Sequence, residues 1–266
     1  MESRKQKEAE FHDKIRNRKL KKDVKKCKHL KSNLKFYSIT KKSGEFVNSY
    51  LVKNCSGKKV LDYCCGDGEM TLFWAQHGAE AIGIDISSTS IQNAKKRAVE
   101  KGLDKRTSFF VMDAEKLEFE DEYFDLILCS GVLHHLDIKK AYPELARVLK
   151  PAGKIICDEP LVYNPVFHLY RKMTPHLRTE WEMHHILSRK EIKLAEKYFG
   201  KVEAKFFHLA TLGAVPFRKL PGFNFILGLL GAVDSVLLRL PILKWLAWQI
   251  VFILSEPKKQ KVNKLN

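Results

Sequence analysis

The 266-residue sequence lacks several features that would place it in a specialised class. No stretch reaches about 18 uninterrupted apolar residues, so a membrane-spanning helix is not expected. The first residues contain no apolar signal region, which argues against export. The six cysteines form no CxxC pair and no Cys/His spacing typical of zinc. We therefore expect a cytoplasmic protein with reduced thiols and no metal site.

Acidic residues are scarce, with 31 Asp and Glu against 48 Lys and Arg, which gives a formal net charge of +17. The excess is concentrated at the ends. Residues 1–35 contain 14 basic and 5 acidic residues, and residues 256–266 contain 4 basic residues and 1 acidic residue. A basic end can attract nucleic acid or an anionic membrane surface, or it can be only a solvated helix face.

The basic N-terminal segment has a helical pattern. Leu20, Val24, Cys27, Leu30 and Leu34 recur at steps of three and four among lysines. This period predicts an amphipathic helix. We therefore expect residues 1–45 to form a basic helical arm, and residues 46–266 to form the domain that follows it.

Short apolar strands alternate with helical segments from residue 59 onwards. Strands are expected at residues 59–62, 81–85, 108–112, 124–129, 154–158, 201–209 and 248–254. Helices are expected at residues 70–77, 88–100 and 138–149, and from a capping box at residues 188–191 to residue 198. This alternation predicts an α/β fold built from parallel βαβ units with right-handed crossovers.

Two segments in the second half interrupt the alternation, and we expect both to be inserts in the domain. Residues 160–187 are rich in proline, histidine and aromatic residues, and residues 210–246 are strongly apolar. Within the second insert, residues 220–246 are broken by prolines and charged residues. This stretch is either a pair of helices packed on the domain or a segment that lies in a membrane interface.

Acidic residues stand at the ends of three successive predicted strands. Asp62 ends the first and is followed by the glycine-containing turn 63–68, Asp85 ends the second, and Asp113 follows the third. The carboxyl ends of parallel strands meet at one edge of a sheet, where a glycine turn and a helix N-terminus admit a nucleotide-type ligand. An acid at the end of the second strand can accept hydrogen bonds from ribose hydroxyls. The sequence therefore predicts a nucleoside site.

Taken together, these segments resemble the motifs of class I methyltransferases that use S-adenosylmethionine (SAM), in particular the ubiquinone/menaquinone methyltransferase-like group. The segments that carry the resemblance are residues 60–68, 83–87, 113–115, 124–127, 133–136 and 147–153. The resemblance implies SAM as cofactor and a Rossmann-like sheet. That sheet would be mostly parallel, with an antiparallel C-terminal strand and helices on both faces.

The resemblance also implies which residues contact the cofactor. Asp85 would bind the ribose, Ile86 would lie against the adenine, and Asp113 and Ala114 would bracket the adenine edge. The remaining implied contacts are Asp62, the backbone of Cys64, Gly66 and Gly68, and Ser130, which would face the methionine carboxylate and the acceptor. Cys64 stands where the family usually has glycine, and its Cβ would narrow the approach to the methionine end of the cofactor.

The methyl acceptor must be recognised by segments beyond the fifth strand. His184 and His185 end a polar and aromatic segment, residues 178–185, which we expect to cover the pocket. We take these two histidines as candidates for an acid/base or substrate-orienting role. A base is needed only if the acceptor is a hydroxyl or an acidic carbon. Further candidates are Glu159, His176, Glu182, His134 and His135.

The aromatic insert and the apolar residues 220–246 favour a small hydrophobic acceptor, such as a lipid or a quinone-like molecule. Its methylation would take place at an anionic membrane surface, to which the basic ends are attracted. Two alternatives stay open: an RNA methyltransferase that grips phosphates with its lysine-rich arm, and a non-catalytic SAM-binding protein. Nucleic acid is the weaker partner, because no added RNA-binding domain is evident.

Overall fold

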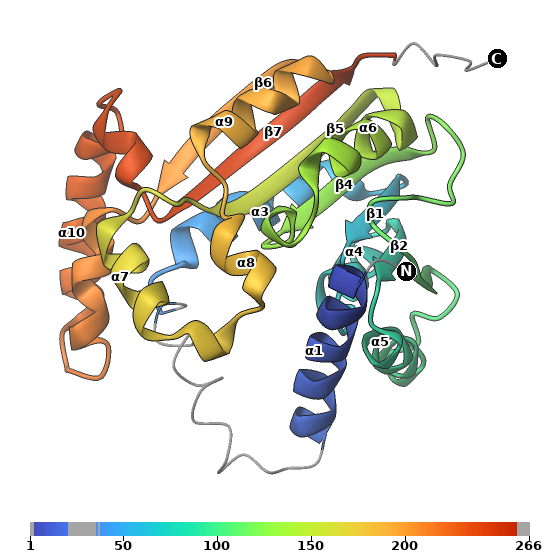
Figure 1. Cartoon of the computed structure of the whole chain (residues 1–266), viewed down its shortest axis with the longest axis horizontal. Helices are drawn as coiled ribbons and strands as arrows, with labels where there is room; N and C mark the ends of the chain where they lie inside the picture. The colour runs from blue at the N-terminus through green and yellow to red at the C-terminus, as the bar shows by residue number, and fades with distance from the viewer. Residues whose placement is uncertain (1–2, 21–35, 37, 260–266) are drawn as a thin grey trace.

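The computed structural model describes residues 3–20, 36 and 38–259, and they contain one seven-stranded sheet (Figure 1). The strand order is β3-β2-β1-β4-β5-β7-β6. The strands are β1 Lys59–Tyr63, β2 Glu80–Asp85, β3 Thr107–Val111, β4 Phe124–Ser130, β5 Leu149–Pro160, β6 Phe199–Phe207 and β7 Gln249–Pro257. Every strand expected from the sequence is therefore present, and the α/β prediction is confirmed.

The direction of the last strand separates this sheet from an all-parallel one. Strands β1 to β5 pair in parallel with one another, and β7 runs antiparallel to both β5 and β6. The predicted antiparallel C-terminal strand is confirmed. Because β1 and β4 lie side by side at the centre, their carboxyl ends open next to each other, where the chain order of the strands reverses.

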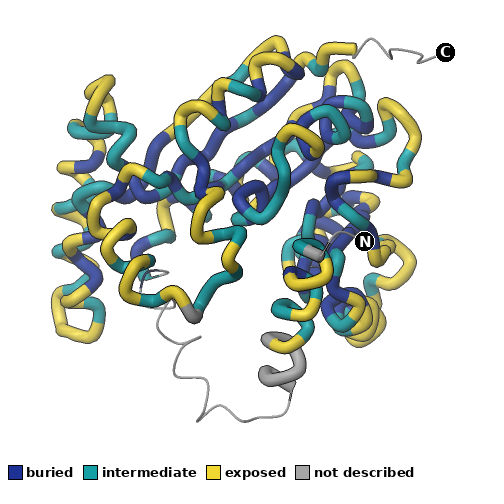
Figure 2. Tube along the Cα trace, viewed as in Figure 1, coloured by how far each residue is buried: buried dark blue, intermediate teal, exposed yellow. Residues whose placement is uncertain are grey.

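Helices cover both faces of the sheet, so its central strands are buried on both sides (Figure 2). On one face, α3 Lys41–Cys55 and α4 Glu69–Gln76 pack on the sheet, with α5 Ser88–Glu100 beside them. On the other face lie α6 Ile138–Val148 and α9 Arg189–Leu194. The expected capping box begins α9, where the Ser188 N–H donates to the Glu191 carboxylate at 2.9 Å.

Residues 165–237 supply three further helices: α7 Pro165–Met173, the short α8 Glu180–His184 and α10 Phe223–Leu237. Helices α7 and α10 form a side lobe, and α8 lies against the 3₁₀ helix Leu133–His135. A separate hydrophobic cluster holds the lobe together around Phe36, Phe167 and Trp248, and the Phe167 and Trp248 rings stack with centroids 4.4 Å apart. The side lobe therefore has its own small core at the end of the sheet where β7 begins.

Residues 220–246 do not form the pair of helices that was one of the two alternatives, and the other alternative, a place in a membrane interface, stays a prediction. One helix, α10, is followed by a short 3₁₀ helix, Leu243–Leu246. Asp234 of α10 is buried and accepts hydrogen bonds from the N–H groups of Leu209, Ala210 and Thr211 at 3.2, 2.5 and 3.3 Å. This carboxylate fixes α10 to the segment that follows β6, because it accepts hydrogen bonds from the otherwise free N–H groups at the start of the 3₁₀ helix Ala210–Phe217.

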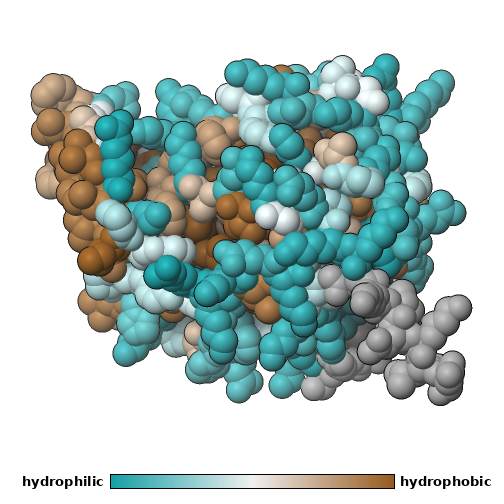
Figure 3. Space-filling view, turned by 90° about the horizontal axis from the view of Figure 1, so that it is seen from above, coloured by the Kyte–Doolittle hydropathy of each residue, from teal (hydrophilic) through white to brown (hydrophobic). Residues whose placement is uncertain are grey.

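One side of α10 stays uncovered. Phe225, Leu229, Val233 and Val236 are 78%, 60%, 40% and 64% exposed, and Ile242 beyond the helix is 82% exposed. Figure 3 shows a large hydrophobic area on this side of the molecule, at the left. Among the described residues, no helix is both long enough and apolar enough to cross a bilayer.

The N-terminal arm contains helix α1 Ser3–Leu20, which lies beside α5. The apolar stripe expected from Val24 to Leu34 lies outside the described residues. Helix α3 runs across residue 45, where the sequence suggested a boundary between arm and domain. That division stays a prediction.

Gly68 is the glycine on which the first turn depends. It has a φ of 73°, and a Cβ at this position would lie 2.8 Å from Ala94 Cβ and from the Phe109 ring. Gly102 has a similar φ of 64° but open space around it. We expect Gly68→Ala to lower the free energy of unfolding by about 3 kcal/mol, from backbone strain and overpacking together. Gly102→Ala should cost only about 1 kcal/mol.

Urea unfolding measures the free energy of unfolding of both variants. Because the backbone strain is similar at the two glycines, the difference between the two losses isolates the steric contribution. Equal losses in the two variants would show that helices α4 and α5 move apart freely, and that the close packing at Gly68 is unimportant.

Candidate functional site

The turn after β1 is tied to the end of β2 by one carboxylate. Asp85 Oδ2 accepts a hydrogen bond from the Gly66 N–H at 2.9 Å, and Asp85 Oδ1 accepts one from the Ser87 N–H at 2.8 Å. The Cys65 N–H also donates to the Ile84 carbonyl at 2.7 Å. A carboxylate has about four acceptor positions, so Asp85 keeps two for a ligand.

Asp62 and Gly68 support this turn from behind. Asp62 is buried and accepts a hydrogen bond from the Thr71 hydroxyl of α4 at 2.6 Å. Burial raises the pKa of Asp62 to about 6, against the lowering effect of Thr71. Neither Asp62 nor Gly68 lines either of the two cavities that lie beside the turn. Their geometry fits a role in orienting the turn and the start of α4.

A cavity of about 230 Å³ lies in front of the turn, and we call it the turn cavity. Seven of the residues expected to contact the cofactor line it: Cys64, Gly66, Asp85, Ile86, Asp113, Ala114 and Ser130. The structure therefore brings the ends of β1, β2, β3 and β4 to one place. Their roles as cofactor contacts remain predictions.

Cys64 adopts a backbone conformation that favours glycine. Its φ is 63°, in the left-handed region, where a side chain costs roughly 1–2 kcal/mol. Burial raises the pKa of its thiol well above the usual value, so the side chain is neutral. This explains why glycine is usual at this position in the resembling family, and why a small side chain is still tolerated.

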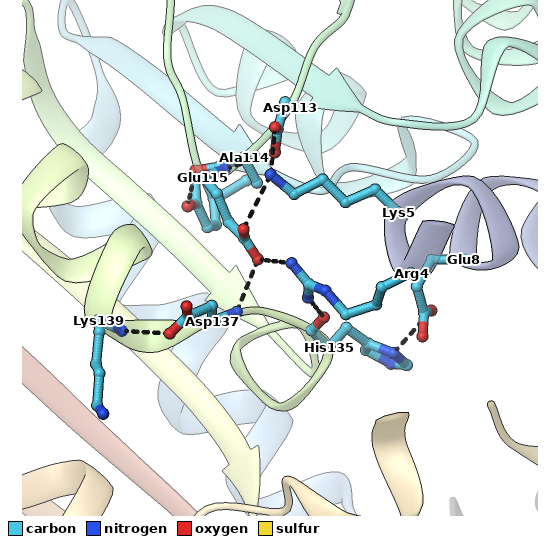
Figure 4. A network of polar contacts seen from close by, with 10 residues as sticks. Arg4, Lys5, Glu8, Asp113, Ala114, Glu115, His135, Asp137 and Lys139 are labelled. Carbon is cyan, nitrogen blue, oxygen red and sulfur yellow. Dashed lines mark hydrogen bonds and ion pairs between the residues drawn. The ribbon is translucent and has the colours of Figure 1, made fainter. Parts of the chain in front are cut away.

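The N-terminal helix α1 forms the remaining wall of the turn cavity (Figure 4). Lys5 Nζ lies 2.7 Å from Asp113 and 3.0 Å from Glu115, and Arg4 forms an ion pair with Glu115. Farther along the helix, Asp13 accepts a hydrogen bond from the Ser87 hydroxyl at 2.5 Å. The arm is thus held against the ends of β2 and β3 by charge.

A second cavity of about 400 Å³ adjoins the turn cavity, and we call it the aromatic cavity because Phe36, Phe167 and Trp248 line it. Its charged and polar wall comes from Ser43, His134, His135, Asp158, Arg171, Arg178, Glu182 and Gln249, among others. Ser130, Gly131 and His135 line both cavities. A ligand in one cavity can therefore meet a ligand in the other at these residues.

Buried acids and a histidine stand at the end of β5. Glu159 accepts hydrogen bonds from the Val132 and Leu133 N–H groups at 2.7 and 2.8 Å, and His134 Nδ1 lies 2.7 Å from its other oxygen. Burial raises the pKa of Glu159 to about 7, although these N–H groups oppose the shift. Burial also lowers the pKa of His134 to about 3, so its ring is neutral.

Asp158 differs from its neighbour because one of its oxygens is unsatisfied within the described residues. Its Oδ1 atom is buried and has no hydrogen-bond partner among the described residues. Burial, with a smaller contribution from the charge of Glu159, raises the pKa of Asp158 to about 7. A carboxyl group of this pKa on a cavity wall is suited to accept a proton near neutral pH.

The structure does not bring His184 and His185 to either of these cavities. Both are exposed and line a separate cavity of about 890 Å³. His185 stacks on Trp181 with ring centroids 3.5 Å apart. The two histidines point away because of the short helix α8. Its residue Glu182 faces the aromatic cavity, so the residues at the end of this helix face outward. The side chain of His176 lies outside the described part.

Sequence reasoning missed two groups of residues on the cavity walls. Arg4, Lys5, Glu8 and His12 belong to an arm that was expected to face a partner. Arg4, Glu8 and His12 recur at steps of four along one helix, with Lys5 beside Arg4, and this spacing was the available signal. Asp158 was overlooked beside Glu159, although its place at the end of a central parallel strand is where ligands bind.

Residues 61–157 match a family model described as a methyltransferase domain. Residues 61–157 are a methyltransferase domain. The cofactor of this domain class is SAM. Two curated relatives show the same similarity: the uncharacterized methyltransferase YcgJ of Bacillus subtilis, 35% identical over 136 residues, and the ubiquinone/menaquinone biosynthesis C-methyltransferase UbiE of Rickettsia massiliae, 36% identical over 107 residues.

The aligned regions cover 47% of this chain and 53% of YcgJ, and 38% of this chain and 43% of UbiE. The chain thus spans about half the length of these curated relatives.

Solved structures share the fold of the methyltransferase domain. The structure of Bacillus subtilis YcgJ has a TM-score of 0.54 at 22% identity, covering 80% of this chain and 97% of that chain. Geranyl diphosphate C-methyltransferase from Streptomyces coelicolor, solved with S-adenosylhomocysteine, has a TM-score of 0.56 at 14% identity. It covers 78% of this chain and 74% of its own. These identities establish the fold and not the substrate.

Asp85 provides the most direct test of the turn cavity. We expect Asp85→Ala to weaken binding of S-adenosylhomocysteine about 100-fold, because two hydrogen bonds from ribose hydroxyls to a charged group are lost. Asp85→Asn should show an intermediate loss. Isothermal titration calorimetry measures the affinities, and Asp104→Ala, at an exposed position, is the matched control. Unchanged affinity in a folded Asp85→Ala protein would remove Asp85 from the site.

Proposed function

We propose that this protein transfers the methyl group of SAM to a small hydrophobic acceptor. The observation that carries the proposal is the shared wall of the two cavities at Ser130, Gly131 and His135. One cavity is lined by the strand ends to which the family resemblance assigns nucleoside binding. The other cavity is lined by aromatic side chains. A donor and an acceptor bound in this way would be aligned, and alignment provides much of the rate of such a transfer.

The residues of the turn cavity would divide the cofactor between them. Asp85 would accept hydrogen bonds from the ribose, and Asp113 and Ala114 would bracket the adenine edge. Ser130 would lie at the methionine end, next to the aromatic cavity. SAM bound there supplies a methyl group that is already activated. The helix α1 would exclude water from the adenosine side.

The aromatic cavity supports a hydrophobic acceptor that also carries a polar group. Phe36, Phe167 and Trp248 offer ring surfaces, and Arg171 has no acidic partner within ion-pair distance among the described residues. The names of the relatives point the same way, because UbiE acts in quinone biosynthesis and a structural neighbour acts on geranyl diphosphate. We infer a quinone-like or isoprenoid-like acceptor.

The exposed face of α10 supports methylation at a membrane surface. We define the α10 patch as Phe217, Leu220, Phe225, Leu229, Val233, Val236, Leu240 and Ile242, all at least 40% exposed. Beside it, a groove of about 1080 Å³ is lined by Lys41, Lys42, Lys205, Arg239 and Lys244. An apolar face flanked by cations is the arrangement by which a helix binds an anionic lipid interface.

RNA is a poorer fit for the arm. Arg4 and Lys5 form ion pairs with Glu115 and Asp113 at the cavity wall, so these two cations are not free to bind phosphates. Incubation of the protein with radiolabelled SAM and a fractionated cell extract decides between the alternatives. We expect label in the lipid fraction. Label in RNA, or cofactor binding with no labelled product, would overturn the proposed acceptor.

Asp158 is the residue that we propose as the general base for an acceptor hydroxyl or acidic carbon. We expect Asp158→Asn to lower the rate of label transfer into lipid roughly 100- to 1000-fold without changing affinity for S-adenosylhomocysteine. The wild-type rate should rise as the pH passes about 7, because the carboxyl group must lose its proton before it can act as a base. This rise should be absent in the variant.

Asp104→Asn, at an exposed position, is the control for the general loss of one carboxylate. A variant at Asp158 that keeps the wild-type rate and pH profile would show that this carboxyl group takes no part in the transfer.

The α10 patch predicts binding to vesicles that contain an anionic phospholipid. We expect the double change Phe225→Ser and Ile242→Ser to weaken vesicle binding at least about 10-fold in a sedimentation assay, because each buried apolar side chain contributes about 1.5–3 kcal/mol. Val99→Ser is the matched control, since Val99 is 67% exposed on the distant α5. Equal binding of all three proteins would exclude the patch as the membrane contact.

A further inference from the structure

Three side chains of the kind that bind transition metals converge where α1 crosses the loop after β4. Glu8 and His12 stand four residues apart on α1, and His135 belongs to the 3₁₀ helix Leu133–His135. One ligand atom from each lies within 4.8 Å of the other two. Figure 4 shows Glu8 reaching down from α1 toward the His135 ring.

Two of the three separations between these atoms are close to those around one tetrahedral ion. Glu8 Oε2 lies 3.4 Å from His135 Nδ1 and 3.7 Å from His12 Nε2. Nitrogen and oxygen ligands stand about 2.0–2.2 Å from Zn²⁺, so two ligands of a tetrahedral zinc ion are about 3.3–3.6 Å apart. The set of two histidines and one glutamate is also one that zinc uses in sites that keep an open position.

Two of the three atoms are buried and are held only by the long ion-pair contacts within this cluster. Glu8 Oε2 lies 3.4 Å from His135 Nδ1, and neither atom has a partner with hydrogen-bond geometry among the described residues. Leaving buried polar atoms unsatisfied costs about 1–3 kcal/mol each, and such atoms call for an explanation. A metal ion between them would satisfy both at once.

Neighbouring residues hold the ligands in place. The other oxygen of Glu8, Oε1, accepts a hydrogen bond from the Thr179 hydroxyl. The carbonyl of His135 accepts one from Arg4 at 3.0 Å, and its ring packs on His134 with centroids 4.3 Å apart. Supporting contacts of this kind fix the orientation of metal ligands in known sites.

We propose that Glu8, His12 and His135 bind a divalent transition-metal ion of the zinc type. All three residues line the turn cavity, and His135 also lines the aromatic cavity. A fourth ligand, such as an oxygen of water or of the acceptor, would reach such an ion from the cavities that these residues line. The ion also links α1 to the domain and so holds the arm over the turn cavity.

Metal titration of the untagged full chain, freed of metal with EDTA, tests this site. We expect one Zn²⁺ per chain by calorimetry, and one Co²⁺ with the visible absorption bands of a tetrahedral site. His12→Gln and His135→Gln should each weaken binding at least about 100-fold, and Thr179→Val should weaken it about 10-fold through Glu8. His77 is an exposed histidine at the C-terminal end of α4, and the control variant His77→Gln should bind the metal like the wild type.

Three results would overturn the proposal: no binding by the wild type, equal binding by the His12 and His135 variants, or a thiolate-to-cobalt absorption band, which would place the ion on cysteine. Thermal unfolding gives a second measurement, since Zn²⁺ should raise the melting temperature of the wild type and not that of His135→Gln. Binding of S-adenosylhomocysteine is measured separately, so failure of the metal site and failure of the proposed transfer are distinguishable.

Discussion

The carboxylate of Asp85 is the constraint on which the rest of the turn cavity depends. It accepts N–H groups from Gly66 of the first turn and Ser87 at the start of α5, so it joins two βα units through one side chain. Both N–H groups come from backbone that no strand or helix satisfies. The same geometry leaves acceptor positions free for a ligand, and structural and binding roles therefore coincide in one residue.

Charge extends this arrangement to the arm. Asp113 and Glu115, at the end of the next strand, would repel each other and Asp85 in a partly buried site. Lys5 and Arg4 of α1 lie between and beside them, so docking of the arm neutralises the acids (Figure 4). The basic arm and the acidic strand ends are complementary parts of one cavity. Two cations of this segment, Arg4 and Lys5 in the first turn of α1, therefore have acidic partners within the protein.

The sequence predicts well whatever depends on neighbours along the chain. Strand ends, the turn at Gly68 and the cap at Ser188 follow from local patterns, and the structure has them where expected. It could not place Lys5 against Asp113, or His12 beside His135, because those contacts join residues more than 100 positions apart. The outward orientation of His184 could not be predicted either. It lies in a helix of five residues, and the orientation of so short a helix depends on tertiary packing more than on the sequence pattern.

The side lobe connects the proposed membrane contact with the proposed acceptor cavity. Helix α10 packs Ile226 and Leu230 into the same hydrophobic cluster as Phe167 and Trp248, which line the aromatic cavity. The opposite side of α10 is the exposed patch. The apolar side chains of this cluster thus lie between the proposed membrane contact and the place where the acceptor would bind. A hydrophobic acceptor that leaves a bilayer at α10 would cross little polar surface on its way, and this lowers the cost of transferring it through water.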